Sequence, residues 1–88
     1  MPGIAVHSLP VPAGAPPGAS YGELRKGTRS EFEIAWRQGP VIALDVIAVA
    51  SSPAPPPSVV AGIGAILGRA AQVQQGRIAR ALEFDRSV

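Results

Sequence analysis

The chain has 88 residues, enough for one small domain, and its net charge of +2 is too small to indicate a polyanionic partner. It contains no cysteine, which excludes disulfide bonds and thiolate metal sites. Ten prolines, ten glycines and only 5% aromatic residues leave few large side chains for a core. We therefore expect a domain that gains stability by assembling with something else.

Residues 1–19 are predicted to form an extended arm. The segment is rich in proline and glycine, has few amide donors and carries no charged side chain. Residues 4–9 have the composition of a short edge strand. The arm is either flexible, or it lies along a partner and becomes ordered there. We expect neither a secretory signal nor an arginine-rich transit peptide in this segment.

Residues 20–50 are predicted to contain a basic loop followed by one β-hairpin. Arg25, Lys26 and Arg29 lie close together beside glycines. Such a cluster indicates a solvated loop, and contact with phosphate or an acidic lipid surface is the alternative.

The first strand of the hairpin is predicted over residues 31–37. Phe32, Ile34 and Trp36 alternate with more polar residues, which is the period of a half-buried strand. A short helix is the alternative, because a capping pattern precedes this segment.

The second strand is predicted over residues 41–49, after a turn signal at residues 38–40. Its apolar, β-branched run is typical of a strand that is covered on both faces. Asp45 interrupts this run. We expect it either to pair with Arg37 across the hairpin or to lie at an exposed edge, and a pore-lining or catalytic acid is the alternative.

Residues 51–57 are rich in proline and are predicted to form a semi-rigid linker. The segment contains a P-x-x-P pattern. Because no basic residue lies nearby, a spacer is a better interpretation than a ligand for a proline-binding groove.

Residues 58–85 are predicted to form one long helix, with Ser58 as its N-cap. At 100° per residue, several apolar side chains share one stripe. They are Val60, Ile63, Leu67, Ala71, Ile78 and Leu82. The helix also contains four glycines, each of which costs about 1 kcal/mol relative to alanine. An isolated helix would be marginal, so packing against another surface must compensate.

One side of this helix is predicted to dock on a partner. Gly64 and Gly68 form a G-x-x-x-G pattern, which lets a neighbouring backbone approach closely. The predicted docking residues are Ile63, Gly64, Leu67, Gly68, Ile78 and Leu82. The alternative is that the same glycine-rich segment packs on the small core of the chain itself.

The sequence contains no constellation that predicts catalysis or a cofactor. His7 is the only histidine, and no carboxylate pair stands beside a nucleophile. The glycines at 62, 64 and 68 imitate a dinucleotide-binding pattern, but no full strand precedes them and the third glycine comes one residue late. We therefore expect a protein that is not an enzyme and binds neither metal nor cofactor.

The combined features predict a small α+β protein with an extended proline-rich N-terminal arm, one β-hairpin, a proline-rich linker and one long C-terminal helix. Its expected function is that of a non-enzymatic structural or accessory protein. It would dock on a larger multi-subunit assembly, such as a virion, through its arm and its glycine-rich helix. No apolar run reaches the length of a membrane-spanning helix. No localisation is predicted.

Two alternatives to this function use the helix differently. In the first, residues 59–67 insert into a membrane and an arginine face meets the headgroups. In the second, which is less favoured, Arg69, Arg77 and Arg80 contact nucleic-acid phosphates. A solvated helical face is the better explanation of these arginines.

Overall fold

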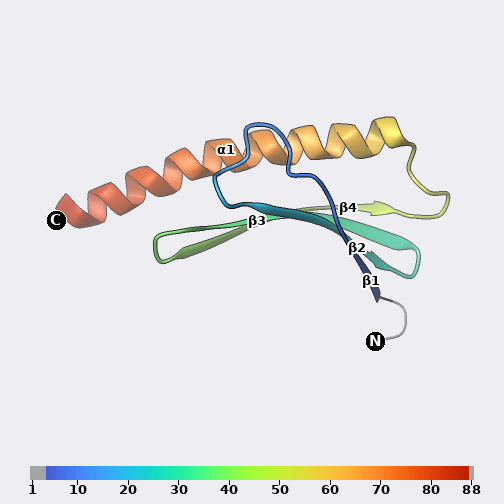
Figure 1. Cartoon of the computed structure of the whole chain (residues 1–88). Helices are drawn as coiled ribbons and strands as arrows, with labels where there is room; N and C mark the ends of the chain where they lie inside the picture. Colours follow the sequence, from blue (N-terminus) through green and yellow to red (C-terminus); the bar gives the residue numbers. More distant parts are fainter. Residues whose placement is uncertain (1–3, 88) are drawn as a thin grey trace.

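The computed structural model describes residues 4–87, which form one antiparallel four-stranded sheet and one helix (Figure 1). The elements are β1 (Ile4–Ser8), β2 (Ser20–Lys26), β3 (Arg29–Gln38), β4 (Val41–Ala50) and α1 (Pro57–Ser87). Each strand pairs with the next in sequence, so the order across the sheet is β1-β2-β3-β4. α1 covers one face of the sheet and packs on β3 and β4. The predicted α+β class, hairpin and C-terminal helix are confirmed.

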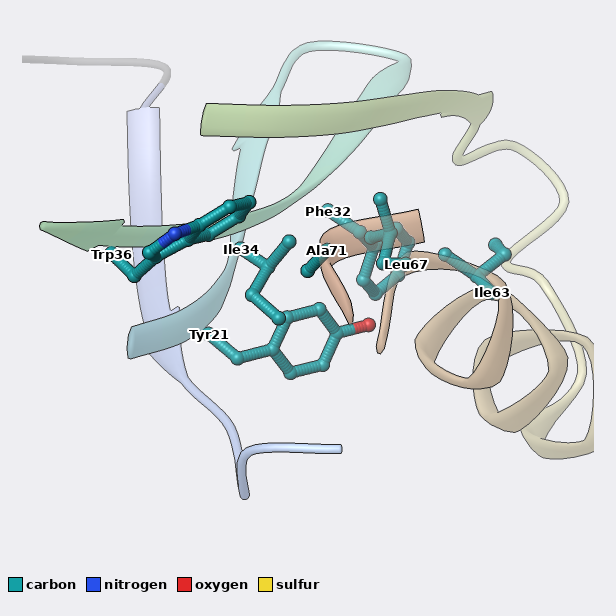
Figure 2. Packing of buried hydrophobic residues seen from close by; sticks show 7 residues of the cluster. All are labelled: Tyr21, Phe32, Ile34, Trp36, Ile63, Leu67 and Ala71. Carbon is teal, nitrogen blue, oxygen red and sulfur yellow. The ribbon is translucent and has the colours of Figure 1, made fainter. Parts of the chain in front are cut away.

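β3 supplies most of the sheet's contribution to the core. Phe32 and Ile34 are fully buried and Trp36 is nearly so, while the residues between them face the side of the sheet without a helix. The predicted alternation of residues 31–37 is therefore confirmed, and the short helix is excluded. The other core residues come from β2 and α1 (Figure 2). They are Tyr21, Ile63, Leu67 and Ala71.

A two-residue turn joins β3 to β4. Gln38 is the register partner of Val41, and Gly39 between them has a φ of +58°. Glycine at the first central position suits the type II′ turn that matches the twist of a hairpin. The predicted turn is confirmed.

β4 differs from its prediction because it is covered on only one face. Its residues alternate between half-buried and exposed along the whole strand. The exposed set lies on the face of the sheet that carries no helix. The apolar composition of β4 predicted that both of its faces are covered. In the structure α1 covers only one face of the sheet, so the other face of β4 is exposed.

The segment predicted as a basic loop instead forms β2, which pairs with both β1 and β3. Carboxylates on β2 and β3 offset the cations at this end of the sheet. Arg25 forms an ion pair with Glu23 at 3.3 Å, and Glu31 forms ion pairs with Arg29 at 2.8 Å and with Lys26 at 3.9 Å. The prediction of a loop was wrong because strand pairing outweighs the poor strand propensity of glycine.

The predicted arm contains β1 and a segment, residues 9–19, that crosses the first half of α1 (Figure 1). The Leu9 amide donates to the Tyr21 carbonyl at 3.0 Å, which holds the start of this segment to β2. The predicted edge strand over residues 4–9 is therefore formed. The rest of the arm lies on the helix of its own chain, and its first three residues lie outside the described part.

α1 begins one residue earlier than predicted. The Pro56 carbonyl accepts from the amides of Val59 at 2.9 Å and Val60 at 3.1 Å, so Pro56 is the N-cap and Pro57 is the first helical residue. Proline suits this first position because its fixed φ is helical and it lacks an amide that would need a partner. The prediction of Ser58 as N-cap was wrong.

Candidate docking surface

β4 forms one edge of the sheet. It pairs only with β3 and runs for ten residues without a break in register. The amide of Ser51, just after the strand, donates to the Thr28 carbonyl at 2.7 Å. Because amides alternate in direction along a strand, the odd-numbered residues of β4 bond to β3 and the even-numbered ones face outward. Within residues 4–87, no other strand pairs with this outer edge.

The side chains of the same even-numbered residues are exposed on the helix-free face. Ile42 is 80% exposed, Leu44 56% and Val46 44%. Single exposed apolar residues are common on protein surfaces, but a contiguous row along one strand indicates an interaction site.

A second row of exposed apolar residues follows α1. Val59, Ile66 and Val73 are 44%, 59% and 53% exposed and recur every seven residues. Ile66 and Val73 line a shallow hollow together with Asp45 of β4, which places this row above the β4 edge. The β4 edge is therefore flanked by apolar side chains in both layers. We call these six residues the β4 side: Ile42, Leu44, Val46, Val59, Ile66 and Val73.

Asp45 faces α1 at this edge. The side-chain amide of Gln74 is assigned with its nitrogen toward Asp45. This nitrogen donates to both carboxylate oxygens of Asp45, each at 2.7 Å. Arg69 and Arg77 line the same hollow. The predicted pairing of Asp45 with Arg37 was wrong, because Arg37 stands opposite Ile42 on the other face and donates to the Gly39 carbonyl at 3.1 Å.

The residues predicted to dock on a partner lie on the inner side and the opposite flank of α1. Ile63 and Leu67 are buried in the core, Ile78 packs against it, and Leu82 lies beside Gly39. These contacts correspond to the alternative that the sequence left open, namely packing on the chain's own core. The exposed apolar row of α1 consists of other residues, namely Val59, Ile66 and Val73.

Gly64 and Gly68 meet the chain's own N-terminal segment. A Cβ built on Gly68 would lie 3.0 Å from Cβ of Pro12 and 3.1 Å from the Ala13 carbonyl oxygen. The expectation that a backbone approaches this G-x-x-x-G is therefore confirmed, with residues 9–15 as the approaching segment.

An apolar hollow of about 620 Å³ lies between residues 9–13 and the first half of α1. The Tyr21 ring forms part of its wall, and the Tyr21 hydroxyl is buried with no hydrogen-bond partner among the described residues. Burial, and secondarily the charge of Glu23, raise the pKa of Tyr21 above 10.0.

Tyr21→Phe is expected to raise the free energy of unfolding at pH 7 by about 1 kcal/mol, because it removes a buried hydroxyl without a partner. In the wild type, the folded state keeps the phenol proton at pH values where the unfolded chain loses it. Tyr21 therefore disfavours ionisation in the folded state, and stability falls as pH rises from 10.0 through the higher folded pKa. Tyr21→Phe abolishes this fall.

Urea unfolding of both proteins at pH 7 and above pH 10 measures this difference. Because Tyr21 is the single tyrosine, the phenolate absorbance reports its pKa directly in the folded protein. A less stable Tyr21→Phe at pH 7 would show that the hydroxyl has a stabilising partner.

The arginines predicted to contact anions are exposed on α1. Arg69 and Arg77 line the hollow beside Asp45 of β4, and Arg80 donates to the Gly76 carbonyl at 3.5 Å. None of the three forms an ion pair with another described residue. The basic cluster at residues 25–29, by contrast, is paired with Glu23 and Glu31.

The described residues contain no group of three or more side chains that could hold a metal ion. Over the same range, no helix is long and apolar enough to cross a membrane. Comparison with known proteins gives no matching family, no matching characterised protein and no matching solved structure.

Proposed function

We propose that this protein is a non-enzymatic accessory subunit that docks on a larger assembly through the β4 side. A partner adds an extended segment to the free edge of β4, so main-chain hydrogen bonds provide affinity. Exposed apolar side chains in both layers then become buried beside the added strand. The observation that supports this proposal is the coincidence of a free ten-residue edge with two flanking apolar rows.

The two edges of the sheet support this assignment by their contrast. Proteins protect exposed edges by short strands, charged side chains, proline or bulges. β1, at one edge, has five residues, whereas β4 has ten, contains neither proline nor lysine, and has Asp45, which faces α1, as its single charge. A long, regular and apolar edge is unfavourable in a free monomer, so a partner that covers it stabilises the protein.

The membrane alternative is less well supported by the packing. It requires residues 59–67 to enter an apolar phase, but Ile63 and Leu67 from this segment form part of the core. Binding to lipid is therefore a competing outcome of the sedimentation experiment.

Leu44→Lys is expected to remove the protein from its assembly without unfolding it, because Leu44 is half-exposed and a lysine at an edge opposes strand addition. The measurement is sedimentation of tagged protein from its native cells, lysed without detergent. Wild type should sediment in a large soluble particle and Leu44→Lys as a slow species.

Val6→Lys, at a 68% exposed position on β1, is the matched control and should sediment like wild type. Equal sedimentation of wild type and Leu44→Lys would contradict the proposal. Release of the wild type only by detergent would favour the membrane alternative instead.

A further inference from the structure

Residues 9–13 and the first half of α1 border the apolar hollow of about 620 Å³, which we call the arm hollow. We propose that the arm hollow binds a medium-chain fatty acid. The aliphatic chain lies along the apolar walls, and Arg69 binds the carboxylate. This site goes beyond the proposed function. Tyr21 of β2 lines the arm hollow, whereas the β4 side lies on the other flank of α1.

Both walls of the arm hollow are apolar. The residues that form them are Leu9, Pro10, Pro12, Val60, Ala61 and Ala65. The two prolines have no amide hydrogen, so their wall offers few backbone donors to water. A volume of about 620 Å³ lies within the range of small-molecule sites, roughly 300–1,000 Å³. Water in such a hollow makes few hydrogen bonds, so an aliphatic chain that displaces it gains free energy.

Small residues on α1 leave this space open. Ala61, Gly64 and Ala65 line the hollow where larger helical side chains would fill it. A Cβ on Gly64 would already lie 3.4 Å from the Tyr21 hydroxyl oxygen and 3.9 Å from Cγ of Pro12. In the part of the chain that the structure describes, the main chain of residues 10–14 forms no hydrogen bond with α1. This segment rests on α1 through side-chain contacts, so it can adjust to the width of an aliphatic chain.

The polar side chains that line the arm hollow can all donate a hydrogen bond, and none of them is acidic. They are Tyr21, Arg69 and Gln72. Burial raises the pKa of Tyr21 above 10.0, so this side chain adds no negative charge at pH 7. The polar group of a ligand therefore has to accept hydrogen bonds, which favours an anion. Because the Tyr21 hydroxyl is buried and Arg69 is exposed, Arg69 is the residue that meets this anion.

The charge of Arg69 is available to a ligand. Arg69 forms no ion pair with another described residue. Asp45 lines the neighbouring hollow together with Arg69, but it accepts from Gln74 at 2.7 Å, and Arg77 lines that hollow as well. The single carboxylate therefore leaves one positive charge uncompensated. One free guanidinium beside a long apolar wall fits a monoanion with an aliphatic body.

Titration calorimetry with decanoate, octanoate, decanol and decylamine tests the chain and the charge separately. Decanoate should bind about tenfold more tightly than octanoate, because it buries two more methylene groups. It should bind about fivefold more tightly than decanol, because the exposed Arg69 attracts its carboxylate. Decylamine, which is cationic at pH 7, should bind most weakly of the three decyl probes. Equal affinities for these three would overturn the anionic ligand, and no binding below the micelle-forming concentration would overturn the site.

Arg69→Gln should lose the preference for decanoate over decanol and bind decanol like wild type. Arg77→Gln is the matched control, because Arg77 is also an exposed arginine of α1 but does not line the arm hollow. It should keep the preference of about fivefold. If both variants lose the preference, or neither does, Arg69 is not the residue that binds the carboxylate.

Ala65→Phe should weaken decanoate binding by more than about tenfold, because the ring occupies the space of several methylene groups. Ala65 is exposed, so the larger side chain leaves the core intact. The matched control is Ala70→Phe, an exposed position that lines the hollow on the other flank, and its affinity should stay that of wild type. Equal affinities of the two variants would overturn the arm hollow as the binding site.

Amide chemical shifts locate the bound probe. Decanoate should shift the amides of Leu9 and residues 60–72, and leave those of Leu44 and Val46 unchanged. Shifts confined to Leu44 and Val46 would overturn the arm hollow as the site. Leu44→Lys should bind decanoate like wild type, because Leu44 does not line the hollow. A failure of the ligand site is therefore distinguishable from a failure of the proposed docking function.

Discussion

Phe32→Ala is expected to remove most of the protein's free energy of unfolding at 25 °C. Phe32 is fully buried at the centre of the sheet, where it contributes to the core between β3 and α1 (Figure 2). Truncating a buried phenylalanine to alanine costs about 3–5 kcal/mol. Small domains have about 5 kcal/mol of stability, and among the described side chains this core contains only seven buried apolar residues. The substitution therefore removes most of the available stability.

Circular dichroism and urea unfolding measure this loss. Val6→Ala is the matched control, because Val6 is 68% exposed and its truncation should change the free energy of unfolding by less than about 0.5 kcal/mol. A Phe32→Ala protein with a wild-type midpoint would show that the core between β3 and α1 is not the main source of stability.

Gly68→Leu is expected to displace residues 9–15 from α1 and to lower the free energy of unfolding by about 1–3 kcal/mol. The position has no room for a side chain, because Pro12 and the Ala13 carbonyl would lie within 3.1 Å of its Cβ. Hydrogen exchange at Leu9, whose amide donates to Tyr21, should accelerate. Urea unfolding gives the loss of stability.

Gly62→Ala is the control for helix propensity alone. A Cβ at Gly62 meets no atom within 4 Å, so alanine there should stabilise the protein by about 1 kcal/mol. Opposite effects at the two glycines of one helix would separate propensity from packing. A stabilising Gly68→Leu would show that residues 9–15 do not rest on α1.

The hairpin and the helix could be predicted because their signals are local. Alternation in β3, the Gly39 turn and the periodicity of α1 are all visible within short windows of sequence. β2 could not be predicted, because Gly22 and a cluster of cations obscure its pattern. In the structure, a Cβ on Gly22 would lie 3.0 Å from the His7 carbonyl, so this glycine lets β1 approach. The need for glycine at position 22 comes from contact with β1, so it cannot be read from the sequence of β2 alone.

The proposed docking surface was harder to predict than the fold because α1 has two apolar rows. The row with Ile63 and Leu67 is the stronger, and it lies on the sheet, as an inner face should. The row with Val59, Ile66 and Val73 becomes distinct only when the helix is docked, since its position relative to β4 depends on tertiary structure. The open edge of β4 likewise follows from strand order, which local sequence does not encode.

The strictly sequential order of the sheet also affects how quickly the chain folds. Every strand pairs with the one that precedes or follows it, so each pairing closes only a short loop. Topologies with mostly local contacts reach their transition state faster than those that join distant segments. The connection from β4 to α1 at residues 51–56 is equally short, so we expect the whole fold to form quickly. Whenever α1 is displaced from the sheet, the apolar side chains of β3 that it covers become exposed to other chains.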